Sequence, residues 1–185
     1  MKITAITSGR KSGNSKQILR HCVESCQADN LEIAELCLSE KKIEYCDGCL
    51  TCDEAGKCHK NDDMCKAISD IEDSDALVFI SPTRWSLLSG DLKVFLDRLN
   101  PLAMPQKLSG KKAIIICVGQ SSLREDQSIK HAITSIEYFC DNAGIKVIGS
   151  HAVEGCLIPG DVTERDNDLE SCARLLSKLT RSEEG

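Results

Sequence analysis

Four closely spaced cysteines form the most specific motif in this sequence. They are separated by two, two and five residues: Cys46, Cys49, Cys52 and Cys58. Thiolates at such short spacing can converge on an iron–sulfur cube while the backbone turns around it. Gly48 and Gly56 give the segment the conformational freedom that this wrapping needs. Structural zinc usually takes two well-separated pairs of ligands. The motif therefore favours a [4Fe–4S] cluster, with zinc and a redox-active or residual thiol loop as the alternatives.

The other cysteines follow a different pattern. Seven of the twelve lie scattered through periodic apolar segments: Cys22, Cys26, Cys37, Cys117, Cys140, Cys156 and Cys172. Because thiols stay reduced in the cytoplasm, a disulfide framework is not expected there. We interpret these seven as small buried hydrophobic residues. Cys65 falls outside the four-cysteine spacing and is expected to be structural, and His59 is expected to be a solvated loop residue.

Composition narrows the class of protein. The 185 residues carry a formal net charge of −6, with a pI near 5.3. Nucleic acid or an anionic membrane as main partner would call for a basic face, so neither is expected. The N-terminus turns polar after seven residues, which is too short for a signal peptide or a membrane span. These features predict a cytoplasmic protein without a membrane partner.

A glycine- and serine-rich loop follows the first predicted strand. Residues 8–16 read SGRKSGNSK and open a predicted helix, so backbone N–H groups, hydroxyls and nearby cations can form an anion cradle. The glycine spacing matches neither the Walker A loop nor the dinucleotide fingerprint. A plain capped turn is the alternative interpretation of this loop.

Two further loops have residues suited to a nucleotide. Residues 81–90 contain Trp85, the only tryptophan, which could equally be a core aromatic residue that anchors the next helix. Residues 119–122 are small and polar. Each signal is weak alone, but a phosphate loop, an aromatic plane and a set of polar donors at one place amount to a nucleotide site.

The elements that position these loops alternate between strand and helix. Strands are predicted from apolar and alternating runs at residues 2–7, 31–38, 76–81, 113–118 and 145–150. Helices are predicted at residues 14–28, 65–73, 89–99, 127–142 and 167–181. Residues 39–64 show no good period and form a cysteine-rich insertion after the second strand.

This alternation is typical of an α/β fold with a doubly wound five-stranded parallel sheet. The absence of repeats and linkers predicts a single domain over residues 1–185. Right-handed crossovers bring all strand-to-helix loops to the carboxyl edge of the sheet, where such folds bind their ligands.

Two stretches of the sequence resemble motifs of the NADPH-dependent FMN reductase family, and the resemblance to this family covers nearly the whole chain. Residues 8–15 resemble its phosphate-binding loop, and residues 81–99 resemble its isoalloxazine loop and the helix that follows. The resemblance implies a flavodoxin-like fold. It implies that the FMN phosphate is bound by Ser8, Arg10, Asn14 and Ser15. It also implies that the ring is wrapped by Pro82, Thr83, Arg84, Trp85, Ser86, Leu87, Gly119, Gln120 and Ser121. Relatives often carry Tyr where this chain has Arg84, which suggests a cation near the pyrimidine edge of the reduced flavin.

The cysteine segment resembles that of the iron–sulfur flavoproteins, a branch of the same superfamily. Its sequence over residues 46–64 is CDGCLTCDEAGKCHKNDDM. The resemblance implies a [4Fe–4S] cluster held by all four cysteines of the motif. Because the insertion leaves the carboxyl edge of the second strand, which neighbours the first in this fold, the cluster is expected on the same side as the flavin. The resemblance also implies a homodimer or a dimer of dimers.

These expectations together predict an FMN- and [4Fe–4S]-dependent oxidoreductase. It would transfer electrons between flavin, cluster and a redox partner or small molecule, with a ferredoxin-like protein or NAD(P)H as donor. No residue stands out as a general acid or base. The alternatives are an NAD(P)H-dependent FMN or quinone reductase without a cluster, a biosynthetic flavin-dependent dehydrogenase, and a zinc-stabilised interaction protein.

Overall fold

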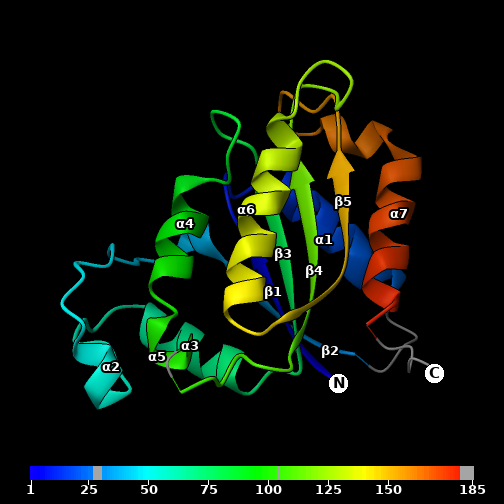
Figure 1. Cartoon of the computed structure of the whole chain (residues 1–185). Coiled ribbons are helices and arrows are strands. Elements are labelled where there is room, and N and C mark those ends of the chain that lie inside the picture. The colour runs from blue at the N-terminus through cyan, green and yellow to red at the C-terminus, as the bar shows by residue number, and fades with distance from the viewer. Residues whose placement is uncertain (27–30, 104, 180–185) are drawn as a thin grey trace.

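Five parallel strands form the centre of the molecule in the order β2-β1-β3-β4-β5 (Figure 1). The computed structural model describes residues 1–26, 31–103 and 105–179. The strands are β1 (Lys2–Thr7), β2 (Glu32–Cys37), β3 (Ala76–Pro82), β4 (Lys112–Val118) and β5 (Lys146–Val153). All four neighbouring pairs are parallel. The predicted doubly wound α/β sheet is confirmed.

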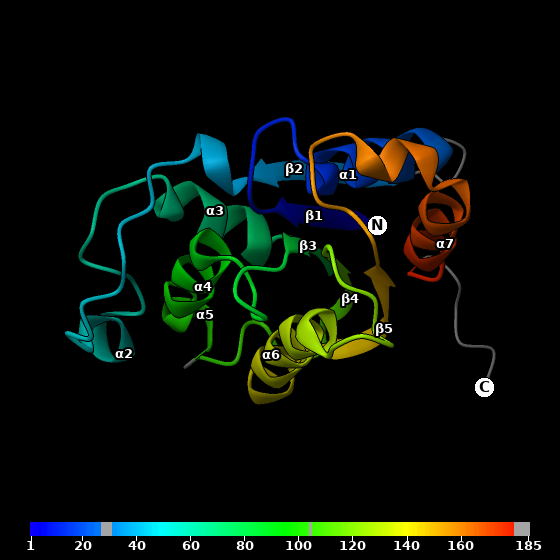
Figure 2. The same ribbon diagram turned by 90° about the horizontal axis from the view of Figure 1, so that it is seen from above.

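Helices cover both faces of the sheet, as the view from above shows (Figure 2). One face carries α1 (Asn14–Ser25) and α7 (Asp166–Ser177). The other carries α3 (Met64–Glu72), α4 (Gly90–Asp97) and α6 (Ser128–Asn142). Short helical segments complete the fold: η2 (Leu38–Glu40), α2 (Thr51–Ala55), α5 (Asn100–Ala103) and η3 (Asp161–Glu164).

Each face of the sheet has its own hydrophobic core. Along β3, Leu77 and Phe79 pack into the core under α3, α4 and α6. Val78 and Ile80 point to the opposite core, under α1 and α7. Both faces of the strand are buried, so its sequence is a continuous apolar run rather than an alternating one. Burial of each such side chain contributes about 1.5–3 kcal/mol.

Two regions differ in detail from the sequence prediction. A helix was predicted over residues 89–99; the structure has α4 over Gly90–Asp97 and then a second helix, α5, which begins with Asn100 and Pro101. Proline suits a first helical turn, where its missing N–H has no partner inside the helix in any case. The predicted irregular segment 39–64 contains η2 and the single-turn helix α2.

The ends of three elements also differ. β5 continues through Val153, three residues beyond the predicted end, because the ladder with β4 extends to Val118. α1 ends at Ser25 and α7 at Ser177. Residues 26 and 178–179, predicted as helix, form turns instead, and residues 27–28 and 180–181 of the predicted helices lie outside the described residues. Within the described ranges, no helix has both the length and the apolar character needed to cross a bilayer.

The cysteine-rich segment leaves the carboxyl end of β2 and runs outward from the sheet. Its helix α2 lies beside α5, away from the edge at which β4 and β5 end (Figure 1). The cluster was expected on the side of the flavin loops, whereas α2, which carries the proposed ligand Cys52, packs beside α5 instead. Strand order places the segment's origin near the first strand, but it does not fix where a long insertion packs.

Candidate functional site

A cavity of about 680 Å³ opens at the carboxyl edge of the sheet. Most of the predicted flavin residues line it: Arg10, Asn14, Ser15, Pro82, Thr83, Arg84, Trp85, Ser86, Gly119, Gln120 and Ser121. Three loops that are far apart in the sequence thus meet at one site, as expected from the topology. Its volume lies in the range of small-molecule and cofactor sites.

The first loop ends at the N-terminus of α1. Gly13 is the N-cap residue of α1, and no side chain makes a capping hydrogen bond to this helix. The first turn of α1 contains no acidic residue. The first N–H groups of a helix have no partner within it and attract anions. Arg10 lines the same part of the cavity. This arrangement fits a phosphate group.

Asn14, which lines the cavity, also contacts the loop that follows β5. Its side-chain oxygen accepts hydrogen bonds from the backbone N–H of Gly160 at 2.9 Å and of Val162 at 3.4 Å. Its side-chain nitrogen donates to the carbonyl of Ile158 at 3.0 Å. The amide therefore holds the start of α1 against the loop that follows β5.

Ser8 does not line the cavity; it is buried behind it. Its hydroxyl lies 3.5 Å from the carbonyl oxygen of Ile80. The next residue, Gly9, has a φ of +91°, and a Cβ atom built on it would lie 2.7 Å from Cγ of Pro82. Its N–H donates to a carboxylate oxygen of Asp91 at 2.8 Å. The first loop is thus tightly packed against the second.

The second loop contains a tight two-residue turn. Arg84 and Leu87 exchange backbone hydrogen bonds of 2.8 and 3.0 Å across it. Trp85 and Ser86 have φ values of 48° and 62°, the left-handed region that favours glycine. Trp85 is 100% exposed, so the interpretation as a core aromatic residue is wrong. Such strain persists where the surrounding structure holds it and is common at ligand sites.

The third loop approaches the second through Gly119. A Cβ atom at this position would lie 2.6 Å from Oγ1 of Thr83 and 2.9 Å from Cγ1 of Ile129. The backbone of Gly119 also donates to the carbonyl of Val153 at 3.0 Å and accepts from the N–H of Cys156 at 2.8 Å. Only a residue without a side chain fits between these neighbours.

A fourth loop, after β5, also lines the cavity and was not predicted. It contributes Cys156, Leu157, Ile158 and Pro159. The carboxylate of Asp161 accepts hydrogen bonds from the N–H groups of Leu157 at 2.7 Å and Ile158 at 2.9 Å. The signal was available, because this loop leaves the same edge of the sheet. Further lining residues that were not predicted are Gly13, Val118, Asp126 and Ser128.

The four cysteines of the motif lie in one segment with an irregular path. Cys52 is buried, Cys46 and Cys58 are half-buried and Cys49 is exposed. Left-handed φ values occur in this segment at Gly48 (71°), Leu50 (59°) and Gly56 (65°). Burial raises the pKa of the Cys52 thiol, as does the neighbouring charge of Asp53.

The arrangement of these thiols is not that of a single-ion site. In the described part of the chain, one group of three metal-binding side chains has its ligand atoms within 4.8 Å of one another: Asp47, Cys49 and His59. His59 Nε2 lies 2.9 Å from Oδ2 of Asp47. Ligands of one zinc ion must converge on a point, whereas those of a cube bind four different irons and surround it. Among the described residues, no three of the four motif thiols lie within 4.8 Å of one another.

The seven cysteines predicted to be buried are buried. Burial raises the pKa of the Cys117 and Cys140 thiols to about 12, so both stay protonated. Cys65, outside the motif, is exposed, and its Sγ lies 3.5 Å from the carbonyl oxygen of Lys60.

A second cavity, of about 760 Å³, lies beside α4 and α6. It is lined by Leu87 and Leu88 of the second flavin loop and by Cys46 and Gly48 of the cysteine segment. Leu87, which does not line the first cavity, lines this one.

Known proteins resemble this chain in sequence and in structure. The NADPH-dependent FMN reductase family matches residues 1–151. An iron-sulfur flavoprotein of Archaeoglobus fulgidus is 31% identical over 177 residues, which cover 95% of this chain and 76% of that protein. An iron-sulfur flavoprotein of Methanocaldococcus jannaschii is 30% identical over 186 residues, covering 97% and 95%.

A solved structure has the same fold. The NAD(P)H:quinone oxidoreductase from Methanothermobacter marburgensis superposes with a TM-score of 0.79 at 18% identity, covering 100% of this chain and 98% of that one. Flavodoxin 1 from Bacillus cereus gives a TM-score of 0.66 at 16% identity, covering 97% of each. The fold is therefore flavodoxin-like. From its sequence and its relatives, the chain belongs to the NADPH-dependent FMN reductase family, in the iron–sulfur flavoprotein branch, and is a flavin-dependent oxidoreductase.

Proposed function

We propose that this protein holds FMN in the cavity at the carboxyl edge and a [4Fe–4S] cluster on Cys46, Cys49, Cys52 and Cys58. It transfers electrons between flavin, cluster and a redox partner or small molecule. The observation that carries this proposal is the second cavity, which one flavin loop and the cysteine segment line together. A flavin loop and a segment with four closely spaced thiols that line one cavity are suited to holding two redox groups that exchange electrons.

The flavin assignment rests on two parts of the first cavity, one suited to the phosphate and one suited to the ring. The uncapped start of α1 and Arg10 favour the phosphate at one end. The turn at Trp85 and the close approach of Gly119 to Thr83 provide a flat, backbone-lined place for the ring at the other. Bound FMN would accept two electrons from a hydride donor such as NAD(P)H and release them singly.

The cluster assignment rests on the cysteine segment itself. Its three left-handed residues let the backbone turn around a bound group, and its thiols are too spread for one ion. The names of the Archaeoglobus and Methanocaldococcus relatives support the same assignment. Cys65 lies outside the set.

Association and location complete the proposal. Tyr45 and Leu50, on the cysteine segment, are 72% and 63% exposed. Exposed apolar side chains beside a redox group favour association, and we propose a cytoplasmic homodimer or dimer of dimers with NAD(P)H or a ferredoxin-like protein as electron donor.

The test is purification without oxygen, followed by iron, sulfide and flavin analysis. About four iron and four sulfide per chain are expected. Replacement of any motif cysteine by Ala should remove or degrade the cluster and leave FMN bound, whereas Cys65→Ala should do neither. Zinc in place of iron, or loss of the metal in the Cys65 variant alone, would contradict the ligand assignment. FMN without iron in the wild-type protein would favour a reductase without a cluster.

The flavin site has its own matched pair of variants. Arg10→Glu places a negative charge at the proposed phosphate end of the cavity and should abolish FMN retention. Lys11→Glu makes the same charge change one residue away, at a side chain that does not line the cavity. Equal FMN retention in the two variants would place the phosphate elsewhere.

A further inference from the structure

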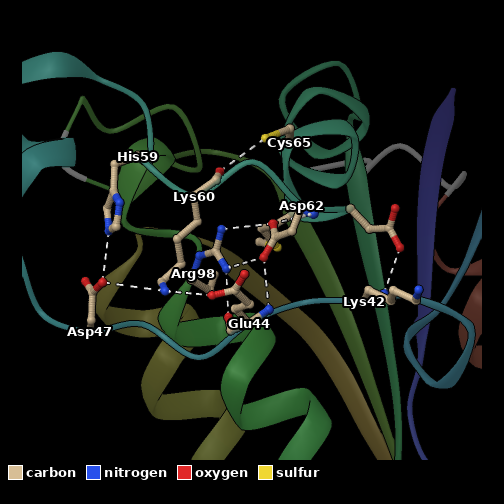
Figure 3. Close-up of polar contacts among 10 residues, drawn as sticks. Lys42, Glu44, Asp47, His59, Lys60, Asp62, Cys65 and Arg98 are labelled. Carbon is tan, nitrogen blue, oxygen red and sulfur yellow. Dashed lines mark hydrogen bonds and ion pairs between the residues drawn. The ribbon is translucent and has the colours of Figure 1, made fainter.

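Hydrogen bonds join the two ends of the cysteine segment, residues 42–44 and residues 60–63, which together form its base (Figure 3). The N–H of Glu44 donates to Oδ2 of Asp62 at 2.9 Å. The N–H of Lys42 donates to Oδ2 of Asp63 at 2.7 Å. On the exposed side, Nζ of Lys60 lies 2.9 Å from a carboxylate oxygen of Glu44. All four cysteines of the motif lie between Glu44 and Asp62 in the chain.

A buried arginine holds this base to the body of the protein. Arg98, at the C-cap of α4, has a side chain that is 1% exposed. It donates two parallel hydrogen bonds to the Asp62 carboxylate, at 2.7 and 3.0 Å, and one at 2.7 Å to the carbonyl oxygen of Glu44. One guanidinium thus contacts both ends of the segment.

The network leaves the carboxylate charged. Burial by itself raises the pKa of Asp62, but hydrogen bonds from Arg98 and from the N–H groups of Glu44 and Met64 outweigh it, so the pKa is lowered. A planar fork that matches a carboxylate is a geometry that arginine provides and lysine does not. Removal of one partner would leave the other as an uncompensated buried charge.

Arg98 also carries a donor without a partner. Burial lowers the pKa of Arg98, but the hydrogen bonds and charge of the Asp62 carboxylate raise it by more. Within the described structure, the buried Nε of Arg98 has no hydrogen-bond partner. A buried cation that is bonded to both ends of the cysteine segment is suited to stabilising negative charge held by that segment.

The same helix reaches the flavin loops. Asp91, in the first turn of α4, accepts the N–H of Gly9 in the first loop at 2.8 Å. Asp91 and Arg98 are separated by about two turns, or roughly 10 Å along the axis. One helix therefore has a contact to the flavin loops at its start and one to the cysteine segment at its end.

We propose that Arg98 is a positioning residue for the iron–sulfur site: its guanidinium joins the two ends of the cysteine segment at Glu44 and Asp62 and places a fixed positive charge against that segment, which favours the reduced cluster. The electrostatic part rests on the proposed function. The closing part concerns the chain itself and holds with or without a bound cluster.

The closing part is tested by amide hydrogen exchange on metal-free protein. Arg98→Met should accelerate exchange of the amides in residues 44–62 at least tenfold and leave β3 and β4 unchanged. Asp62→Asn, which keeps the side-chain shape, should act alike and serves if Arg98→Met fails to fold. Arg20→Met is the matched control, since Arg20 is 78% exposed and pairs with Glu24 on its own helix. Unchanged exchange in both Arg98→Met and Asp62→Asn, or unprotected amides at the base in the wild type, overturns this part.

The electrostatic part is tested by redox titration of the iron–sulfur signal in loaded protein. Loss of the charge in Arg98→Met should disfavour reduction about tenfold, a fall of about 59 mV for a one-electron couple. Arg98→Lys keeps the positive charge but not the pair of parallel hydrogen bonds to Asp62. It should therefore accelerate amide exchange in residues 44–62 but lower the cluster potential less than Arg98→Met does. A wild-type potential in loaded Arg98→Met overturns the electrostatic part alone. A wild-type protein without iron overturns the proposed function and the electrostatic part, while the exchange data still decide the closing part.

Discussion

The contact between Gly9 and Pro82 predicts how strongly the first two loops of the cavity depend on each other. Gly9→Ala places a Cβ atom 2.7 Å from Cγ and 3.2 Å from Cδ of the proline ring. The ring is rigid, so relief requires movement of the backbone of either loop. The residue also has a φ of +91°, which an L-residue adopts only with strain.

The two effects can be estimated separately. The left-handed conformation costs a non-glycine residue about 1–2 kcal/mol, and overpacking typically costs about 1–3 kcal/mol. Gly110→Ala is a matched control, because Gly110 has a φ of +81° with no neighbour within 4 Å of its Cβ position. We expect Gly110→Ala to lower the free energy of unfolding by the first amount alone and Gly9→Ala by roughly the sum, about 2–5 kcal/mol.

The assays are urea unfolding and fluorescence titration with FMN. If the clash is relieved by displacement of the two loops, the FMN dissociation constant of Gly9→Ala should rise by about 5- to 150-fold, because 1–3 kcal/mol corresponds to that range. Gly110→Ala should bind FMN as the wild type does. Equal losses of stability in the two variants, with unchanged FMN affinity in Gly9→Ala, would refute the idea that these loops are packed too tightly to move independently.

Three further outcomes are expected. Arg84→Ala should lower the two-electron potential of bound FMN by tens of millivolts in a redox titration, about 30 mV for each 1.4 kcal/mol, because a cation favours the reduced, negatively charged flavin; an unchanged potential would mean that Arg84 faces elsewhere. Asn14→Ala should lower the free energy of unfolding by about 1 kcal/mol, since it removes three hydrogen bonds to exposed or partly buried backbone groups, and weaken FMN binding. The N–H groups of Ile158 and Leu157 hold the pKa of Asp161 below its usual value, so its stabilisation is complete above the unfolded pKa of about 3.9 and is lost as the pH falls through the lower folded pKa. Asp161→Ala should therefore lower the melting temperature at neutral pH, and a gap that persists in strong acid would contradict this assignment.

Features set by local sequence and topology could be predicted, and those set by long-range packing could not. Continuous apolar runs identified β3 and β4 because both faces of a central parallel strand are buried. The convergence of three loops followed from the handedness of the crossovers. By contrast, the position of α2 beside α5 depends on contacts between segments far apart in the chain, which no local pattern encodes.

The candidate site shows the same division. Arg10, Ser15 and Gly119 line the cavity as their loops predict. The amide of Asn14 is occupied by the loop after β5, and that loop was missed because the predicted strand ended too early. Arg98 gave no sequence signal, because a charged residue at the end of an amphipathic helix is ordinarily solvated and only the fold shows this one to be buried.

The bridge from Asn14 to the loop after β5 has a consequence for how the protein matures. It joins residues separated by 144 to 148 positions, so its formation carries the entropic cost of closing a long loop of chain. During synthesis, domains begin to fold from the N-terminus, but the start of α1 cannot be fixed against this loop until residue 162 has left the ribosome. The cofactor cavity therefore lacks one of its four lining loops until the segment after β5 has been synthesised and has packed against α1.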